Sequence, residues 1–404
     1  MDDKPRADMV YYPLAAFRTT LHVKDSTLKK MSKRLSKQTR SYLINAAIIL
    51  ITLGAVLFIS AQGGDINDAW ATLRSADPFW IGMAVLSWCV FMTFEGMGLH
   101  VFFRQQKVKI RVGLSILTGM IGSFYSAVTP AATGGQPMQV LFLRKRGYSS
   151  GLTSSGLAVK FFTFQTALLS LGALLWIFNP GPLKNCPPEA MWVTAVGYFI
   201  NGLSVAAVIL LAINKNIVRA VLRFFINAGH KLRLIRDKEK MSARAENAIA
   251  DFHSSVDMLT HHPIRLFHLY LVSCLQVLGL MSIVYCVYRA LGLNEYSYFD
   301  ILTLQFLLFI AASFTPLPGS SGAQEGGFYV FFQNVFPADK LVGALLLWRF
   351  FTYYLTMIVG VSAVIFDSAW SMRNAREKNA AETEGSVGCA DPEGEEHQDT
   401  EEAE

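Results

Sequence analysis

The sequence is short of charge and rich in long apolar runs. Charged residues make up 16% of the 404 residues, whereas hydrophobic residues make up 52% and the mean hydropathy is +0.35. Soluble domains carry about 25% charged residues. The composition therefore excludes an ordinary soluble protein and favours a polytopic membrane protein. Since the apolar runs are of helix-spanning length, we expect an all-α integral membrane protein.

Motifs for catalysis and for metal binding are also lacking. The five cysteines show no CxxC spacing, which argues against a metal site and a disulfide framework. There is no HExxH motif and no Walker loop, and Ser321 does not lie in a GxSxG elbow because Ala323 occupies the last position. We expect no catalytic residue, no bound metal and no cofactor.

Charge is distributed unevenly along the chain. Residues 1–41 contain ten Lys or Arg, whereas Glu382–Glu404 contains ten acids and no base. Because the bases lie beside apolar spans, the positive-inside rule explains them and no nucleic-acid partner is expected. We predict a basic cytoplasmic N-terminal segment (1–41) with no secretory signal peptide, and an acidic disordered cytoplasmic tail (367–404).

Six apolar runs are long enough to cross a bilayer, which takes about 20 helical residues. They are Tyr42–Ser60, Trp80–Phe103, Gly156–Phe178, Met191–Ile213, Leu266–Tyr288 and Leu341–Phe366. Between them, the basic segment 214–265 is predicted to be a cytoplasmic connector. Its stretch Ile217–Ile235 is expected either to lie along the inner leaflet as an amphipathic helix or to be an ordinary connector.

Two further apolar runs are interrupted at membrane depth by prolines and glycines. The first break, Thr129–Pro137, reads TPAATGGQP, and the second, Thr315–Gly327, reads TPLPGSSGAQEGG. Irregular backbone at this depth survives only where protein buries it or a wet cavity lines it. We predict two re-entrant hairpins, one entering from the cytoplasm and one from outside, within halves 80–178 and 266–366 of an inverted-topology repeat. In secondary transporters such repeats place the substrate site near the midplane.

Four charged residues lie within or beside these runs: Glu95, Lys160, Glu325 and Arg349. A charge at the bilayer centre costs about 2.5 to 3.5 kcal/mol on insertion scales, so each should face protein or water. We expect them to line one polar cavity, where the cations attract a lipid phosphate; ion pairs that lock the two halves together are the alternative. Gln136 and Gln324 are expected either to bind head-group hydroxyls or to cap the broken helices.

The two breaks resemble those of the flippase-like transmembrane domain of the lysylphosphatidylglycerol synthase (MprF) family. The likeness lies in TPAATGGQP followed by LRKRG at Leu143–Gly147 and in PLPGSSGAQE at Pro316–Glu325, and it extends over about 42–366. The resemblance implies a lipid translocase that moves aminoacylated phosphatidylglycerol between leaflets of the bacterial cell membrane, with both chain ends cytoplasmic. With the charged residues, the candidate binding residues are Glu95, Thr129, Pro130, Gly134, Gly135, Gln136, Arg144, Lys160, Pro318, Gly319, Gln324, Glu325 and Arg349.

In that family a separate cytoplasmic domain makes the lipid from aminoacyl-tRNA. Neither the 38 residues after Phe366 nor the 52 residues of 214–265 are enough for such a domain. A lysyltransferase is therefore a lesser alternative, as are a carrier for a small polar solute and an accessory subunit of a separate lipid synthase. The expected partners are membrane phospholipid and either that synthase or further copies of the chain.

Overall fold

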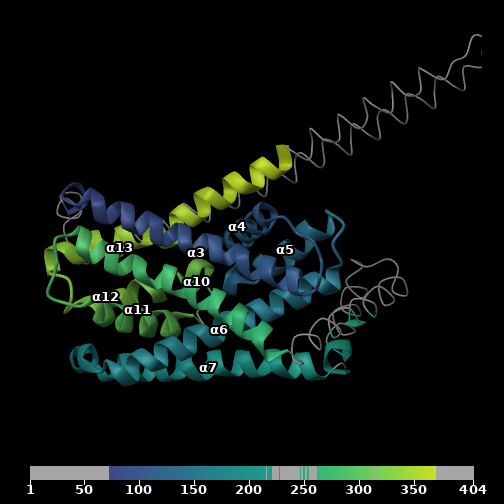
Figure 1. Cartoon of the computed structure of the whole chain (residues 1–404). Coiled ribbons are helices and arrows are strands. Elements are labelled where there is room, and N and C mark those ends of the chain that lie inside the picture. Colours follow the sequence, from purple (N-terminus) through teal and green to yellow (C-terminus); the bar gives the residue numbers. More distant parts are fainter. Residues whose placement is uncertain are drawn as a thin grey trace, which may run out of the picture. The chain divides into compact units, whose positions relative to one another are not determined.

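A computed structural model describes residues 72–214, 216–220, 262–313 and 317–369, with Thr315 and isolated positions at 227, 246, 249–250 and 253. The described part is helical and contains no strand. Its elements are α3 (Pro78–Gln105), α4 (Val112–Val128), η1 (Pro130–Ala132), α5 (Gly135–Arg144), α6 (Ser150–Phe178), η2 (Gly181–Asn185), α7 (Pro188–Ile213), α10 (Pro263–Ala290), α11 (Tyr298–Ala312), η3 (Pro318–Ser320), α12 (Ala323–Phe332), α13 (Ala338–Arg349) and the π-helical turn η4 (Phe350–Tyr354) (Figure 1).

Five helices within these ranges are long and apolar enough to cross a membrane. They are α3, α6, α7, α10 and the continuous helix Ala338–Ala369, which contains α13 and η4. They correspond to five of the six predicted spans and confirm a polytopic all-helical fold. The sixth span, Tyr42–Ser60, lies outside the described residues, as do the segment 1–41, most of the connector 214–265 and nearly all of the acidic tail.

Local capping explains why several helices begin before the predicted residues. Asp77 accepts a hydrogen bond from the backbone N–H of Phe79 at 2.9 Å, and Pro78 stands at the first turn of α3. The Ser149 hydroxyl accepts from Leu152 N at 3.4 Å and starts α6 six residues earlier than predicted. Such caps satisfy amides that the first turn leaves free, so polar residues at these positions extend the helix beyond its apolar run.

The first helices of the two halves, α3 and α10, lie side by side and run antiparallel over their full length (Figure 1). Near one end, Asp77 N donates to the carbonyl oxygen of Ala290 at 2.8 Å. In the middle, Ser87 Oγ donates to Gly279 O at 2.7 Å. At the other end, Gln105 Nε2 donates to Arg265 O at 3.1 Å. The two halves are therefore oppositely directed, as the inverted repeat requires.

Each half contains a helical hairpin whose arms are in close contact. In the first, α4 and α5 approach at small residues: a Cβ on Gly135 would lie 2.0 Å from Ser126 Oγ. In the second, α11 packs on α12 at Gly327, where a Cβ would lie 2.2 Å from Leu308 Cδ1. Because α4 follows the C-terminal end of α3 and α11 follows that of α10, the hairpins enter from opposite ends of the antiparallel pair.

The breaks between the hairpin arms are shorter than the sequence predicts. The returning helices begin at Gly135 and Ala323, so Gln136, Gln324 and Glu325 lie in first helical turns and not in the breaks. Gly135 is the first residue of α5 and not part of the break. Its lack of a side chain lets α5 approach α4 closely. The expected breaks to Pro137 and to Gly327 were therefore too long at their C-terminal ends.

Most of the described hydrophobic core belongs to the second half. Its largest fully buried side chains include Trp348, Tyr288, Phe306, Phe328 and Phe332. By contrast, α7 is mostly exposed, and it contacts α6 and α11. The rigid part that supports a site is therefore built by α10 to α13, with the first hairpin packed against it.

Candidate functional site

The two hairpin tips adopt the same unusual backbone conformation. Ala131 and Ala132 have positive φ values of 51° and 55°, and Gly319 and Ser320 have 61° and 51°. Each pair directly follows a proline, Pro130 or Pro318. The segment PAATGGQ of the first tip therefore aligns with PGSSGAQ of the second tip. Gln136 thus corresponds to Gln324, and Glu325 corresponds to Pro137. The earlier Thr-Pro dipeptide of the second break, at 315–316, is not the counterpart of 129–130.

These two tips contact each other, although Pro130, Ala131 and Ala132 of the first tip are themselves exposed. The turn η1 lies against η3, and η3 also contacts the end of α4. Tyr353 joins both tips: its hydroxyl donates to Ala127 O at 3.3 Å, and its ring fills the space beside Gly319. A Cβ on Gly319 would lie 2.2 Å from Cε2 of that ring, so glycine is required there by both φ and space.

A cavity of about 730 Å³ lies beside the tips, a volume usual for small-molecule sites. Both halves line it. Its walls combine aromatic rings with polar groups: Phe91, Phe161, Phe164, Phe309, Trp348 and Tyr353 with Glu95, Gln136, Gln139, Lys160, Gln276, Gln305, Gln324 and Arg349.

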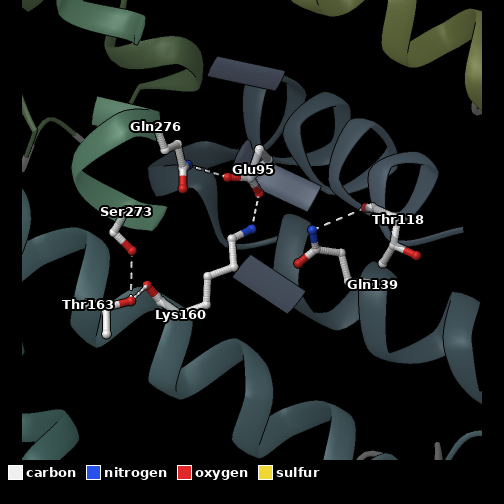
Figure 2. Close-up of polar contacts among 7 residues, drawn as sticks. All are labelled: Glu95, Thr118, Gln139, Lys160, Thr163, Ser273 and Gln276. Carbon is white, nitrogen blue, oxygen red and sulfur yellow. Dashed lines mark hydrogen bonds and ion pairs between the residues drawn. The ribbon is translucent and has the colours of Figure 1, made fainter. Parts of the chain in front are cut away.

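The first half contributes an ion pair to this wall, and a residue of the second half completes it as a three-residue polar contact. Lys160 on α6 forms an ion pair with Glu95 on α3, and Gln276 Nε2 on α10 donates to the other carboxylate oxygen of Glu95 at 2.5 Å (Figure 2). The side chains of Lys160 and Glu95 are 10% and 15% exposed. Glu95 is thus held by both halves, while part of the pair stays open to the cavity.

The second half contributes a more deeply buried pair. Arg349 NH2 lies 2.6 Å from Glu325 Oε1, and the two side chains are 5% and 1% exposed. The other oxygen of Glu325 accepts from Gly322 N at 2.6 Å, which caps α12. Arg349 also reaches the carbonyl oxygen of Gly319 at 3.5 Å. This pair therefore ties the tip turn η3 and the start of α12 to α13.

All four charged residues are paired, and Glu95, Lys160 and Arg349 line the cavity, whereas Glu325 does not. Each ion pair lies within one half, and the two halves are not locked together by them. The link between halves at this point is the neutral donor Gln276, which the sequence interpretation did not single out. A buried carboxylate on α3 needs several hydrogen-bond donors. A polar residue within the otherwise apolar α10 could therefore have been recognised in the sequence as a candidate donor.

The predicted site residues divide into two groups. Glu95, Gln136, Lys160, Gly319, Gln324 and Arg349 line the cavity, and Glu325 lies behind Arg349. Thr129 instead ties the first tip: its hydroxyl donates to Tyr125 O at 2.6 Å and accepts from Gly134 N at 2.9 Å. Gly134 and Gly135 serve close packing, Pro130 and Arg144 are exposed, and Pro318 begins η3.

A short repeat around the two cations was also missed. Lys160–Phe164 reads KFFTF, and Arg349–Tyr353 reads RFFTY. The first lies in the uninterrupted α6, whereas the second enters the π-helical turn Phe350–Tyr354. After the matched threonines, one extra residue separates Thr352 from Thr356 compared with Thr163 and Thr166. A π turn holds one residue more than an α turn, which accommodates the insertion.

These features define a polytopic helical membrane protein in which two broken hairpins surround a polar cavity. The chain belongs to the family described as the lysylphosphatidylglycerol synthase TM region, which matches residues 43–360 and so includes both hairpins. It is similar to a UPF0104 membrane protein of Archaeoglobus fulgidus, with 23% identity over 325 residues, covering 78% of this chain and 94% of the relative.

Proposed function

We propose that the protein binds the head group of a polar phospholipid in this cavity and moves the lipid between leaflets. The observation that carries the proposal is the meeting of two oppositely entering hairpin tips beside a cavity with aromatic and paired charged walls. Interrupted helices in inverted repeats form such sites in transporters. We further propose that the protein resides in the cell membrane with both chain ends in the cytoplasm.

The pair Lys160–Glu95 supports a head group that contains both a phosphate and an ammonium. A phosphate can replace Glu95 as the partner of Lys160, while an ammonium can replace Lys160 as the partner of Glu95. Both buried charges then keep a partner, which avoids the cost of an unpaired buried charge. An aminoacylated phospholipid such as lysylphosphatidylglycerol has this combination, in agreement with the family name.

The proposal is tested by leaflet-specific labelling of candidate lipids in proteoliposomes. We expect wild-type protein to redistribute at least one phospholipid and Lys160→Met to slow that redistribution about tenfold, since a hydrogen bond to a charged group contributes about 1.5 to 3 kcal/mol. Glu325→Gln and Arg349→Ala should slow it as well.

The control is Arg146→Met, which breaks the ion pair with Asp367 outside the cavity and should leave the rate unchanged. Size-exclusion profiles check that every variant folds. Equal redistribution by wild-type protein and by empty vesicles, for every lipid examined, would reject lipid transport.

A further inference from the structure

Basic residues are concentrated where α3 joins α4 and where α5 joins α6. Residues 104–111 contain four cations and no acid, and residues 144–149 contain three cations and no acid. Six of these seven cations are exposed, and we call these six the basic surface: Arg104, Lys107, Lys109, Arg111, Arg144 and Lys145.

Packing holds the two segments of the basic surface together. The Tyr148 hydroxyl donates to Lys109 O at 3.1 Å, and the Tyr148 ring lies against Phe103 with centroids 5.4 Å apart. Ile110 and Leu143 are both buried in one hydrophobic cluster. The exposed cations are therefore carried by one continuous and well-packed part of the fold.

The basic surface has no acidic partner in the described part of the chain. The seventh cation, Arg146, forms an ion pair with Asp367, but none of the ion pairs among the described residues includes a residue of the basic surface. The positive-inside rule accounts for the sign of these charges. Like charges this close in sequence also repel one another, so an acidic partner would stabilise them.

The pair Arg146–Asp367 brings an acidic segment of the same chain close to this surface. The last described helix ends at Ala369, so the chain continues from a point two residues beyond Asp367. Residues 382–404 contain ten acids and no Lys or Arg. Thirteen residues lead from Ala369 to Glu382, and at about 3.5 Å per residue they span up to ~45 Å. The acidic segment can therefore reach the basic surface.

We propose that the acidic segment 382–404 binds to the basic surface of its own chain. Blocks of like charge are commonly interaction segments. Covalent attachment gives such a segment an effective concentration on the order of mM, which a free acidic molecule must match in order to compete. The bound segment covers the end of the bundle where the first hairpin begins and ends. Since both partners are exposed, salt releases it.

Carbodiimide cross-linking of the full-length protein in lipid nanodiscs tests this contact. The reagent condenses a carboxylate with a lysine amine that it touches, and mass spectrometry identifies the joined residues. In phosphatidylcholine mixed with phosphatidylglycerol, we expect links within one chain between acids of 382–404 and Lys107, Lys109 or Lys145. Their yield should fall severalfold between about 0.1 M and about 1 M salt, because the Debye length falls from about 10 Å to about 3 Å.

A control lysine and two combined variants show whether charge directs the contact. Lys184 is exposed beyond the far end of α6 and should form no such link. Arg104→Gln, Arg111→Gln and Arg144→Gln together remove half of the charge but keep the three reactive lysines, and should lower the yield at these lysines severalfold. Arg104→Lys, Arg111→Lys and Arg144→Lys together keep the charge and should keep the yield.

Several results would overturn the proposal. One is that acids of 382–404 are joined only to lysines of residues 1–41 or only to another copy of the chain. A second is that the links form in phosphatidylcholine alone and disappear when phosphatidylglycerol is added, because anionic lipid then occupies the basic surface. A third is an equal yield in the two combined variants. Each of these results leaves the proposed lipid redistribution untouched.

Discussion

Positive φ values recur at the hairpin tips. Ala131, Ala132 and Ser320 have φ of 51°, 55° and 51°, a region that costs an L-residue roughly 1 to 2 kcal/mol, whereas Gly319 adopts 61° without that cost. Strained backbone persists where the surroundings determine it, and it is common at ligand sites. Here it occurs twice, at equivalent positions on the two sides of one cavity.

Substitutions at three glycines of the second hairpin can test backbone strain and steric contact separately. Gly319 has a positive φ and the Tyr353 ring beside it; Gly322 has a positive φ of 87° and open space; Gly326 has open space and lies in α12. In thermal unfolding, we expect Gly326→Ala to be neutral or stabilising by up to about 1 kcal/mol. Gly322→Ala should destabilise by roughly 1 to 2 kcal/mol.

Gly319→Ala should destabilise more than Gly322→Ala, because its Cβ also displaces Tyr353. It should slow lipid redistribution as well, since that ring joins the two tips. An unfolding temperature for Gly319→Ala equal to that of Gly322→Ala would show that the ring moves aside at little cost.

For single residues, the sequence predicted which charges would be enclosed by protein better than it predicted their partners. The cost of a charge in an apolar run identified Glu95, Lys160, Glu325 and Arg349. That Lys160 pairs with Glu95 depends on how α6 lies against α3, which no local pattern encodes. The family resemblance predicted Thr129, Gly134 and Gly135 as binding residues; the structure shows their capping and close packing, which the sequence alone did not reveal.

Among the elements, the π-helical turn Phe350–Tyr354 is the clearest difference between the two halves. It follows Arg349 directly and precedes Thr356, whose hydroxyl accepts from Trp88 Nε1 at 3.0 Å. Further along, Gly360 lies against α4, where a Cβ would be 2.5 Å from Phe124 Cβ. The π turn therefore absorbs the extra residue, so that Arg349 before it and Thr356 and Gly360 after it all face their neighbours.

Deleting Leu355 should therefore be tolerated. The π turn becomes an α turn as in α6, and Thr356 and Gly360 keep their neighbours. Deleting Ile358 instead rotates Gly360 by about 100° away from α4, at 3.6 residues per turn. In thermal unfolding in detergent we expect the second deletion to lower the midpoint clearly more than the first; equal losses would contradict the insertion account.

The hydrophobic pattern predicted the elements well because the bilayer sets their lengths. The predicted span Met191–Ile213, for example, ends at the same residue as α7. The ends of the returning helices were harder to place, since Gly135 is helical here through contact with Ser126 on α4. Contacts between helices decide where such a helix begins, and these contacts cannot be inferred from a single sequence.

For the whole molecule, the antiparallel pair α3 and α10 fixes the entry sides of the hairpins. Each helix has 28 residues, so at 1.5 Å per residue its ends lie about 42 Å apart, more than the ~30 Å hydrocarbon core. The loop before α4 and the loop before α11 therefore reach opposite faces of the membrane.

Single cysteines test this arrangement in a cysteine-free background. Lys109→Cys, before α4, and Asn294→Cys, before α11, are both exposed positions. An impermeant maleimide should label each from one face only, and from opposite faces, in right-side-out and inverted vesicles. Labelling of both from the same face would reject the oppositely entering hairpins.

The pairing of the buried charges has an electrical consequence. Moving one elementary charge through the membrane potential changes the energy by about 2.3 kcal/mol per 100 mV. Glu95 with Lys160 forms one neutral unit on the cavity wall, and Arg349 on that wall forms another with Glu325 behind it. A rearrangement that moves each pair as a unit carries no net charge from them, so under the proposed lipid-transport function a voltage would act through the charge of the lipid.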